Sequence, residues 1–222
     1  MVFPRPIQAV VFDMDGLLID SEGLVREGMI LAAANLGYEM TIPLCASMIG
    51  LPEAAGIQKI RDHFGPAFPL ERYLAEERAQ VDLLLAEGIA LKTGVVEILD
   101  HLDQLGLPRA VATSSSRRSA KKHLGQNGVY QRFHAIVARE DVERHKPHPD
   151  PFLKAAALMR IEPSLCLALE DSHNGVRAAH AAGMMTVMVP DLLEPTQEMH
   201  DKCVAIAESL HHVLALIDQS RI

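Results

Sequence analysis

The chain has 222 residues, of which 49% are hydrophobic and 23% charged, and its formal net charge is −8. This balance is typical of a soluble globular protein with a buried core. The length suits one domain carrying a sizeable insertion. The negative charge argues against nucleic-acid binding as the main activity. Three cysteines without a CxxC pair argue against a disulfide framework or a zinc site, and no apolar run approaches the roughly 18 residues that a membrane span needs.

The first predicted strand ends at an acidic segment. Residues 7–12 form a short apolar run that predicts a buried strand, and the sequence continues as Asp13-Met14-Asp15-Gly16. Four helical patterns follow, broken by glycine and proline and with no convincing strand between them. They cover residues 22–36, 44–48, 53–64 and 70–87. We therefore expect residues 17–91 to form an all-helical insertion after the first strand.

Near residue 91 the pattern changes, and apolar runs of strand length begin to alternate with helical patterns. The predicted strands are residues 109–112, 135–138, 165–169 and 186–189. The predicted helices are residues 95–104, 117–127, 150–159, 175–182 and 208–217. Such alternation implies right-handed crossovers and a parallel sheet. We predict an α/β protein whose core, residues 1–16 and 92–222, carries the helical insertion of residues 17–91.

Polar side chains follow the predicted strands of the core at the points where these strands end. In strand order they are Asp13 and Asp15, Thr113 and Ser114, Lys146, and Glu170 and Asp171. Ligands of a doubly wound sheet bind beyond the carboxyl ends of its strands. We therefore expect these side chains to meet at one edge of the sheet.

This set of side chains suits phosphoryl transfer assisted by a metal ion. A carboxylate about 4 Å from a phosphate dianion is repelled by roughly 8 kcal/mol at an effective dielectric constant near 20, so positive charge must offset the repulsion. Lys146 supplies one fixed positive charge. Glu170 and Asp171 would hold Mg²⁺, which prefers hard oxygen ligands.

The other roles are assigned as hypotheses on the same grounds. Asp13 attacks phosphorus and forms an aspartyl-phosphate. Asp15 protonates the leaving oxygen and later deprotonates the water that hydrolyses the intermediate. Thr113 and the amide of Ser114 cradle the phosphoryl oxygens.

Helix capping is a simpler interpretation of several of these residues. Thr113 and Ser114 could cap a helix, and Glu170 and Asp171 could cap the next one. Either pair could do so while still binding its ligand. For Asn174, ordinary capping and a supporting hydrogen bond to the site stay open as equal alternatives.

Four segments of the chain together resemble the ordered motifs of the haloacid dehalogenase superfamily. They are Phe12-Asp13-Met14-Asp15-Gly16, Ala112-Thr113-Ser114-Ser115, Lys146-Pro147-His148-Pro149-Asp150 and Glu170-Asp171-Ser172-His173-Asn174-Gly175. The resemblance covers residues 9 to about 190. It implies a Rossmann-like core with an inserted helical cap, Asp13 as nucleophile and Asp15 as acid and base. It also implies magnesium at Asp13, at the Asp15 carbonyl and at Asp171.

Within this superfamily the chain resembles the branch that contains β-phosphoglucomutase, 2-deoxyglucose-6-phosphatase and pseudouridine-5′-phosphatase, the last of them most closely. The mutase pattern has a histidine after the first motif and a cap arginine that grips a second phosphate; Val25 and Glu53 stand at these positions. A glutamate would repel that phosphate, so a phosphatase is favoured. A hexose phosphomutase and a non-catalytic protein that binds phosphorylated metabolites stay open as alternatives.

The expected substrate is a small phosphorylated metabolite, either a sugar phosphate or a nucleoside 5′-monophosphate. We expect Mg²⁺ as the cofactor, no nucleic-acid or membrane partner, a monomeric state and a cytoplasmic location. We expect the helical cap to cover the active site, to exclude bulk water during transfer and to select the substrate.

Overall fold

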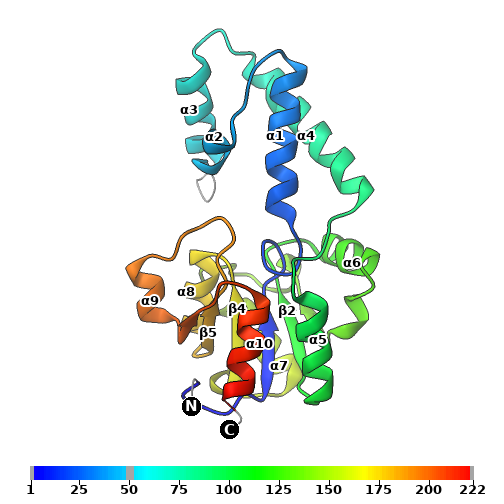
Figure 1. Cartoon of the computed structure of the whole chain (residues 1–222), viewed down its shortest axis with the longest axis vertical. Helices are drawn as coiled ribbons and strands as arrows, with labels where there is room; N and C mark the ends of the chain where they lie inside the picture. Colours follow the sequence, from blue (N-terminus) through cyan, green and yellow to red (C-terminus); the bar gives the residue numbers. More distant parts are fainter. Residues whose placement is uncertain (1–2, 49–52, 221–222) are drawn as a thin grey trace. The chain divides into compact units, whose positions relative to one another are not determined.

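A computed structural model describes residues 3–48 and 53–220, apart from the side chains of Glu22 and Glu53, and the chain divides into two compact units (Figure 1). The core unit comprises Met1–Asp20 and Ala90–Ile222, and the helical unit comprises Ser21–Ile89. Glu53, which entered the comparison with the mutase pattern, has its side chain outside the described part of the structure.

The chain segments that leave and re-enter the core unit pair with each other. Ile19 and Leu91 form an isolated antiparallel bridge, and the Lys92 amide donates to the Leu18 carbonyl over 3.0 Å. Because of this pairing, residues 17–20 and 90–91 belong to the core unit, whereas the expected boundaries fell after residues 16 and 91.

The core unit is built on a six-stranded sheet with the order β3-β2-β1-β4-β5-β6, and all five strand pairs are parallel. The strands are β1 (Ala9–Phe12), β2 (Arg109–Ala112), β3 (Ala135–Val137), β4 (Cys166–Glu170), β5 (Met185–Met188) and β6 (Ala205–Ile206). The predicted parallel α/β fold is confirmed. The sequence did not reveal β6, because two residues are too short to show a strand pattern.

The register of the sheet brings the ends of its central strands level. Phe12 at the end of β1 pairs with Val111 of β2 and with Leu169 of β4. The chain runs outward from β1 through β2 to β3 and then crosses back to β4. This change of direction beside β1 is where ligands bind in open α/β sheets.

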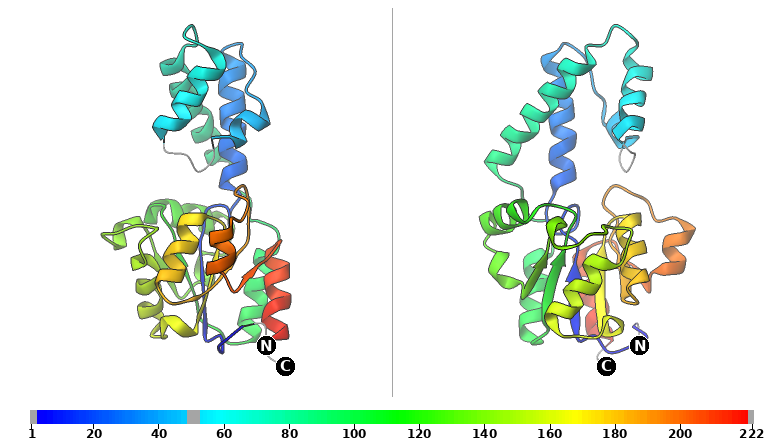
Figure 2. Two further views of the ribbon diagram at one scale, coloured as in Figure 1. Left: turned by 90° about the vertical axis from the view of Figure 1, so that its left-hand side faces the viewer. Right: turned by 180° about the vertical axis from the view of Figure 1, so that it is seen from behind.

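Helices cover both faces of this sheet. On one face, α7 (Asp150–Met159) and α8 (His173–Ala181) pack on small side chains of the strands. These side chains are Ala9, Val11, Ala110, Ala112, Cys166 and Ala168. On the opposite face lie α5 (Val95–Gln104) and α10 (Leu210–Gln219), which contact each other (Figure 2). Small strand residues allow α7 to approach the sheet closely, so the core is dense without many aromatic rings.

The remaining elements of the core unit are short or peripheral. They are α6 (Arg117–Gln126), α9 (Gln197–Lys202) and the 3₁₀ helices η1 (Tyr130–Arg132), η2 (Arg139–Asp141) and η3 (Pro163–Leu165). The sequence pattern did not predict α9, because its six mostly polar residues contain only one buried apolar side chain, Met199.

The helical unit contains α1 (Ser21–Asn35), α2 (Ile42–Ala46), α3 (Glu53–Phe64) and α4 (Leu70–Glu87). Gly28 lets α1 approach α4, since a Cβ atom there would lie 2.5 Å from Val81 Cγ2. Four aromatic rings of the helical unit contact one another in edge-on, stacked and tilted arrangements, and they belong to Tyr38, Phe64, Phe68 and Tyr73. The aromatic residues of this chain are few, and this cluster concentrates them where a small bundle needs apolar area.

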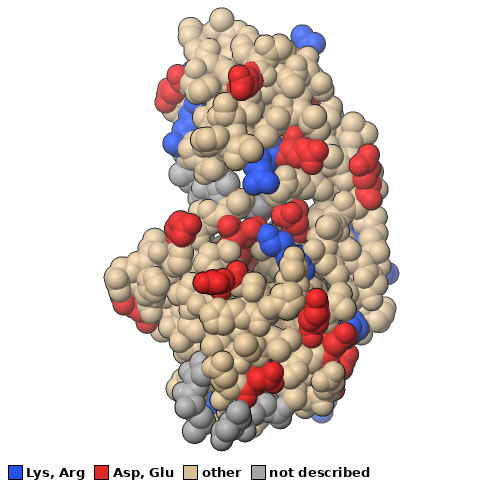
Figure 3. Space-filling model, viewed as in Figure 1, with Lys and Arg blue, Asp and Glu red and all other residues tan. Residues whose placement is uncertain are grey.

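The charged surface of the chain is mixed in sign. On the face drawn in Figure 3, acidic side chains are spread over the core unit with basic side chains among them. In the described residues, every helix is too short or too polar to serve as a membrane span.

Candidate functional site

The first acidic residue of the sequence follows β1 directly and is held by the sheet. The Asp13 amide donates to the Leu169 carbonyl of β4 over 2.9 Å. The Asp13 residue is only 6% exposed, whereas Asp15 is half-buried. The backbone of the sheet therefore fixes one carboxylate in a buried position at the switch point, with a second one two residues further on.

Lys146 lies between η2 and α7 and points its ammonium group into the same position. Its side chain is 6% exposed, and Nζ contacts Asp13 Oδ1 and lies 2.5 Å from Glu170 Oε1. The ammonium nitrogen also lies 5.1 Å from the centre of the Phe152 ring. A buried ammonium group with two carboxylate partners is well compensated for the loss of water.

Glu170, the last residue of β4, is fully buried and hydrogen-bonded through both oxygens. While Oε1 faces Lys146, Oε2 accepts from the Ser172 hydroxyl over 3.0 Å and from the Ser172 amide over 3.3 Å. A Cβ atom on Gly175 would lie 1.8–2.0 Å from the carboxylate group of Glu170. The glycine in the first turn of α8 thus makes room for this carboxylate.

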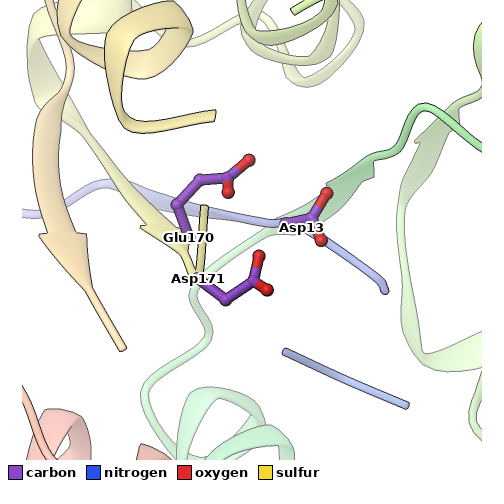
Figure 4. Close-up of side chains that lie close together, drawn as sticks. All are labelled: Asp13, Glu170 and Asp171. Atoms are coloured by element: carbon purple, nitrogen blue, oxygen red, sulfur yellow. The ribbon is translucent and has the colours of Figure 1, made fainter. Parts of the chain in front are cut away.

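Asp171 completes a cluster of three carboxylates. One oxygen each of Asp13, Glu170 and Asp171 lies within 4.8 Å of the other two, and Figure 4 shows the three groups converging beyond the ends of β1 and β4. Gly16, with φ +83°, lies beside Asp171, because a Cβ atom there would be 2.2 Å from Asp171 Oδ2. A side chain at residue 16 would therefore displace this carboxylate.

The three carboxylates carry more negative charge than one ammonium group can offset. Burial raises the pKa of Asp13 to about 8 against the opposing effect of Lys146. Burial also raises the pKa of Asp171 to about 9, helped by the charges of Asp13 and Glu170. Burial alone would lower the pKa of Lys146, but the two carboxylates beside it raise it instead. Full ionisation of the cluster needs a further cation.

The donor atoms of this cluster fit a hard divalent cation. All of them are carboxylate oxygens, which Mg²⁺ and Ca²⁺ prefer, and no sulfur or imidazole belongs to the group of described residues. The raised pKa values of Asp13 and Asp171 also indicate a cation site, since a bound cation would favour the ionised forms of both carboxyl groups.

Asp15 faces the loop after β2 and accepts two hydroxyl hydrogen bonds on one oxygen. Its Oδ2 accepts from Thr113 Oγ1 over 3.1 Å and from Ser115 Oγ over 2.8 Å. The Ser115 amide in turn donates to Thr113 Oγ1 over 2.9 Å. The side chain of Ser114 is exposed. The structure thus brings Asp15 together with Thr113, and Ser115 is a member of this group that the sequence analysis did not select.

The capping interpretations of the motif residues are wrong for both helices. Ser116 caps α6 by accepting from the Ser119 amide, so Thr113 and Ser114 lie outside the cap. Ser172 caps α8 by accepting from the Gly175 amide over 3.1 Å.

Asn174 belongs to neither the cap nor the carboxylate cluster. It lies in the first turn of α8, where its Oδ1 accepts from Arg177 Nη1 over 3.0 Å. Because Ser172 is the N-cap of α8, Glu170 and Asp171 do not cap this helix, and both belong to the carboxylate cluster.

Known proteins resemble this chain over most of its length. The family profile described as haloacid dehalogenase-like hydrolase matches residues 10–189. A Drosophila melanogaster protein named probable pseudouridine-5′-phosphatase is 35% identical over 195 residues, which cover 84% of this chain and 83% of that protein. Hexitol phosphatase B of Escherichia coli K12 is 34% identical over 197 residues, covering 86% of each chain. A Thermotoga maritima crystal structure provisionally named as β-phosphoglucomutase is 26% identical, with a TM-score of 0.81 and coverage of 96% of this chain and 99% of that one.

Proposed function

Because the chain belongs to the haloacid dehalogenase-like hydrolase family, as its four motifs predicted, we propose that it is a magnesium-dependent phosphatase acting through an aspartyl-phosphate at Asp13. The enzyme class follows from the family profile and from two phosphatase-named relatives that align over more than four fifths of the chain. The chain is therefore a hydrolase that acts on phosphoric monoesters. Magnesium, the covalent intermediate and the substrate are the proposed refinements.

The contact of Lys146 with both Asp13 and Glu170 carries the proposed mechanism. A buried carboxylate that attacks a phosphate dianion needs positive charge beside it, since roughly 8 kcal/mol of repulsion opposes the approach at about 4 Å. The hydrogen bond from Lys146 to Glu170 fixes the ammonium group beside the attacking oxygen. The protein therefore does not have to rearrange to bring this positive charge into place during the reaction.

Asp13 would act as the nucleophile. Its carboxylate oxygen forms a bond to phosphorus while the bond from phosphorus to the alcohol oxygen breaks. Attack by water on the phosphorus of the aspartyl-phosphate then releases inorganic phosphate and restores Asp13. The fixed backbone position of Asp13 at the end of β1 supports this role, because it orients the attacking oxygen in advance.

Asp15 would move the protons of both steps. It gives a proton to the leaving alcohol oxygen and takes one from the attacking water. The hydroxyl groups of Thr113 and Ser115 hold its carboxylate on one oxygen and leave the other for this exchange. Thr113 and the Ser114 amide would also bind phosphoryl oxygens.

The carboxylate groups of Asp13 and Asp171 would hold Mg²⁺, with Glu170 supporting the site and the Asp15 carbonyl as a further ligand. When bound, the ion would offset negative charge on the phosphoryl group. Glu170 is best placed to keep Lys146 and the Ser172 loop in position, since both its oxygens are already engaged by them.

The proposed substrate is a small phosphorylated sugar, polyol or nucleoside. Support comes from the relatives at 34–35% identity, which are named for hexitol phosphates and for pseudouridine 5′-phosphate. A screen of phosphate release from phosphorylated sugars, sugar alcohols and nucleoside 5′-monophosphates, including pseudouridine 5′-monophosphate, tests the proposal. We expect release from at least one of these classes in the presence of Mg²⁺.

A phosphomutase is the alternative that the fold also suits. Incubation with β-glucose 1-phosphate separates the two activities, because a mutase would isomerise it without net release of phosphate. Binding of phosphorylated compounds with neither release nor isomerisation would instead favour a non-catalytic binding protein and contradict the proposal.

A further inference from the structure

A partly buried ion pair lies next to the carboxylate cluster but belongs to none of the four motifs. Asp191 follows β5, and its Oδ1 lies 2.6 Å from Lys92 Nζ on the segment that re-enters the core unit. The Asp191 side chain is 14% exposed. Its second oxygen, Oδ2, is buried and has no hydrogen-bond partner among the described residues.

Asp191 lies beside Gly16, on the same side of this glycine as Asp171. A Cβ atom on Gly16 would be 2.2 Å from Asp171 Oδ2 and 3.6 Å from Asp191 Oδ2. The two carboxylate oxygens therefore approach the same side of one glycine. Asp191 is a fourth carboxylate beside the cluster of three, and its free oxygen is the one that faces this cluster.

Lys92 is held in place by the chain as well as by its partner. Its amide donates to the Leu18 carbonyl over 3.0 Å, two residues after Gly16. Its ammonium group also lies 3.7 Å from Asp20 Oδ1, but the Asp20 side chain is 50% exposed and water screens that contact. The pairing with Asp191 is the more buried of the two.

We propose that Asp191 and Lys92 are positioning residues of the metal site, whose opposite charges together set its affinity for a divalent cation. Neither residue is assigned as a ligand. Asp191 adds negative potential beside Asp171 and favours cation binding, while Lys92 cancels most of that potential and limits the affinity. This inference rests on the proposed metal site at Asp13 and Asp171.

A purely structural ion pair makes a different prediction. If the pair only tied the re-entering segment to the loop after β5, loss of either partner would loosen the site and weaken cation binding in the same direction. The electrostatic role predicts opposite directions, because each substitution leaves the other charge uncompensated.

The test is calorimetric titration of Mg²⁺ into the whole protein and its variants. We expect Lys92→Met to bind Mg²⁺ about tenfold more tightly and Asp191→Asn several-fold more weakly, on the scale of one unit charge in a partly screened site. The double variant should return to within about twofold of the wild type. Lys92→Arg, which keeps the charge, should bind as the wild type does.

Two controls separate the possible failures. Arg132 also pairs with a carboxylate, that of Asp100, but it lies just before β3, whereas Asp191 follows β5 on the other side of the sheet's central strands. Arg132→Met therefore removes one paired positive charge away from the cluster and should leave Mg²⁺ binding unchanged. Asp171→Asn tests the metal site itself. Absence of Mg²⁺ binding in the wild type would overturn that site and this inference with it.

Normal wild-type binding with both single variants unchanged, or with both weaker, would overturn the role of the pair alone. Circular dichroism and thermal unfolding of each variant identify any loss of fold. If Lys92→Met does not fold, Lys92→Gln takes its place as the variant that removes the positive charge: tighter Mg²⁺ binding in it supports the role of the pair, and weaker or unchanged binding overturns that role.

Discussion

The two units of the molecule bury different kinds of side chain. In the core unit the buried polar and charged residues are Asp13, Arg109, Thr113, His123, Glu170 and Thr186. In the described part of the helical unit the buried residues are hydrophobic, and they surround the aromatic cluster of Phe68 and Tyr73. Burial of a charge is costly unless it is paired, whereas burial of an aromatic ring is favourable by itself.

This difference indicates where chemistry and stability are encoded. Asp13 and Glu170 are buried together with Lys146, an arrangement that packing alone would not favour over apolar residues of similar size. The helical unit needs only shape and apolar area to hold its helices together. Substitutions in the core site should therefore change turnover far more than stability, and those inside the helical unit should do the reverse.

Asp13→Asn should produce the largest effect. The amide keeps the size of the side chain but is a poor nucleophile, so we expect turnover to fall by about three orders of magnitude or more. The thermal midpoint should stay close to that of the wild type or rise, since burial disfavours the charge of Asp13. Phosphate release and a melting curve on the same preparation measure both. Unchanged turnover would remove Asp13 from the role of nucleophile.

Removal of the metal should have the next largest effect. EDTA should abolish phosphate release, and added Mg²⁺ should restore it. The residue that depends most on the ion is Asp171, whose burial beside Asp13 and Glu170 disfavours its ionised form. Full activity in EDTA, in protein freed of bound metal, would contradict the proposed cofactor.

The same residues predict how stability depends on pH. The pKa of Asp13 rises from 3.8 to about 8 and that of Asp171 from 3.8 to about 9. Between about pH 5 and 8 the metal-free folded state therefore binds more protons than the unfolded chain, and its stability falls as the pH rises. Mg²⁺ competes with these protons, so the stabilisation that it gives should be larger at pH 8 than at pH 5.5.

Melting curves with EDTA and with Mg²⁺ at the two pH values test this expectation. The lowered pKa values of exposed carboxyls such as Asp103 and Glu198 affect stability at more acidic pH. Burial lowers the pKa of His123, which acts in the opposite sense but equally with and without the ion. A gain from Mg²⁺ that is the same at both pH values would contradict the ionisation scheme.

The sequence predicts the strands of the core unit better than the contacts of its site. Strand β2 is apolar after its first residue, Arg109, and is bounded by clear breaks, and its predicted bounds are those observed. The chemical residue types after each strand were also readable, because parallel strands present their carboxyl ends at one edge. By contrast, β6 and α9 are held by their neighbours rather than by a local pattern.

The details of the site depend on side-chain directions and close approaches that residue spacing does not encode. Ser115 rather than Ser114 reaches Asp15, and Ser116 takes the cap of α6. The space that Gly175 gives to Glu170 involves two backbone segments whose packing is set by the whole α8–β4 contact. The partnership of Lys92 with Asp191 joins residues far apart in the sequence and outside any motif.

Two glycine substitutions compare the units directly. Gly175→Ala would place Cβ within 2.0 Å of the Glu170 carboxylate, and Gly28→Ala would place it 2.5 Å from Val81 Cγ2. Overpacking of this kind costs about 1–3 kcal/mol in each case. We expect Gly175→Ala also to lower turnover by about tenfold or more, because Glu170 holds Lys146. Gly28→Ala should leave turnover per folded molecule within about twofold.

Gly125→Ala is the matched control for these two variants. Gly125 lies within α6, and a Cβ atom there would meet nothing within 4 Å. Alanine favours a helix over glycine by up to about 1 kcal/mol, so this variant should be slightly stabilised with unchanged turnover. Denaturant unfolding measures the stability of the three variants, and phosphate release measures their turnover. Equal losses of turnover in Gly28→Ala and Gly175→Ala would remove the distinction between the units.

Ser115→Ala should have the smallest effect and tests how finely the core site is held. Ser115 donates one of the two hydroxyl hydrogen bonds on Asp15 Oδ2, and Thr113 donates the other. Loss of a single hydrogen bond to a charged group costs about 1.5–3 kcal/mol at most, and less when a second donor remains. We therefore expect turnover to fall by about three- to tenfold.

Because Asp15 acts in proton transfer, the loss of turnover in Ser115→Ala should depend on the leaving group. Substrates with a good leaving group such as p-nitrophenol need little protonation and should be nearly unaffected, whereas alkyl phosphates should show the full effect. Ser114→Ala, at the exposed neighbouring residue, is the control and should change neither. An equal loss for both kinds of substrate would place Ser115 in binding rather than in the orientation of the acid.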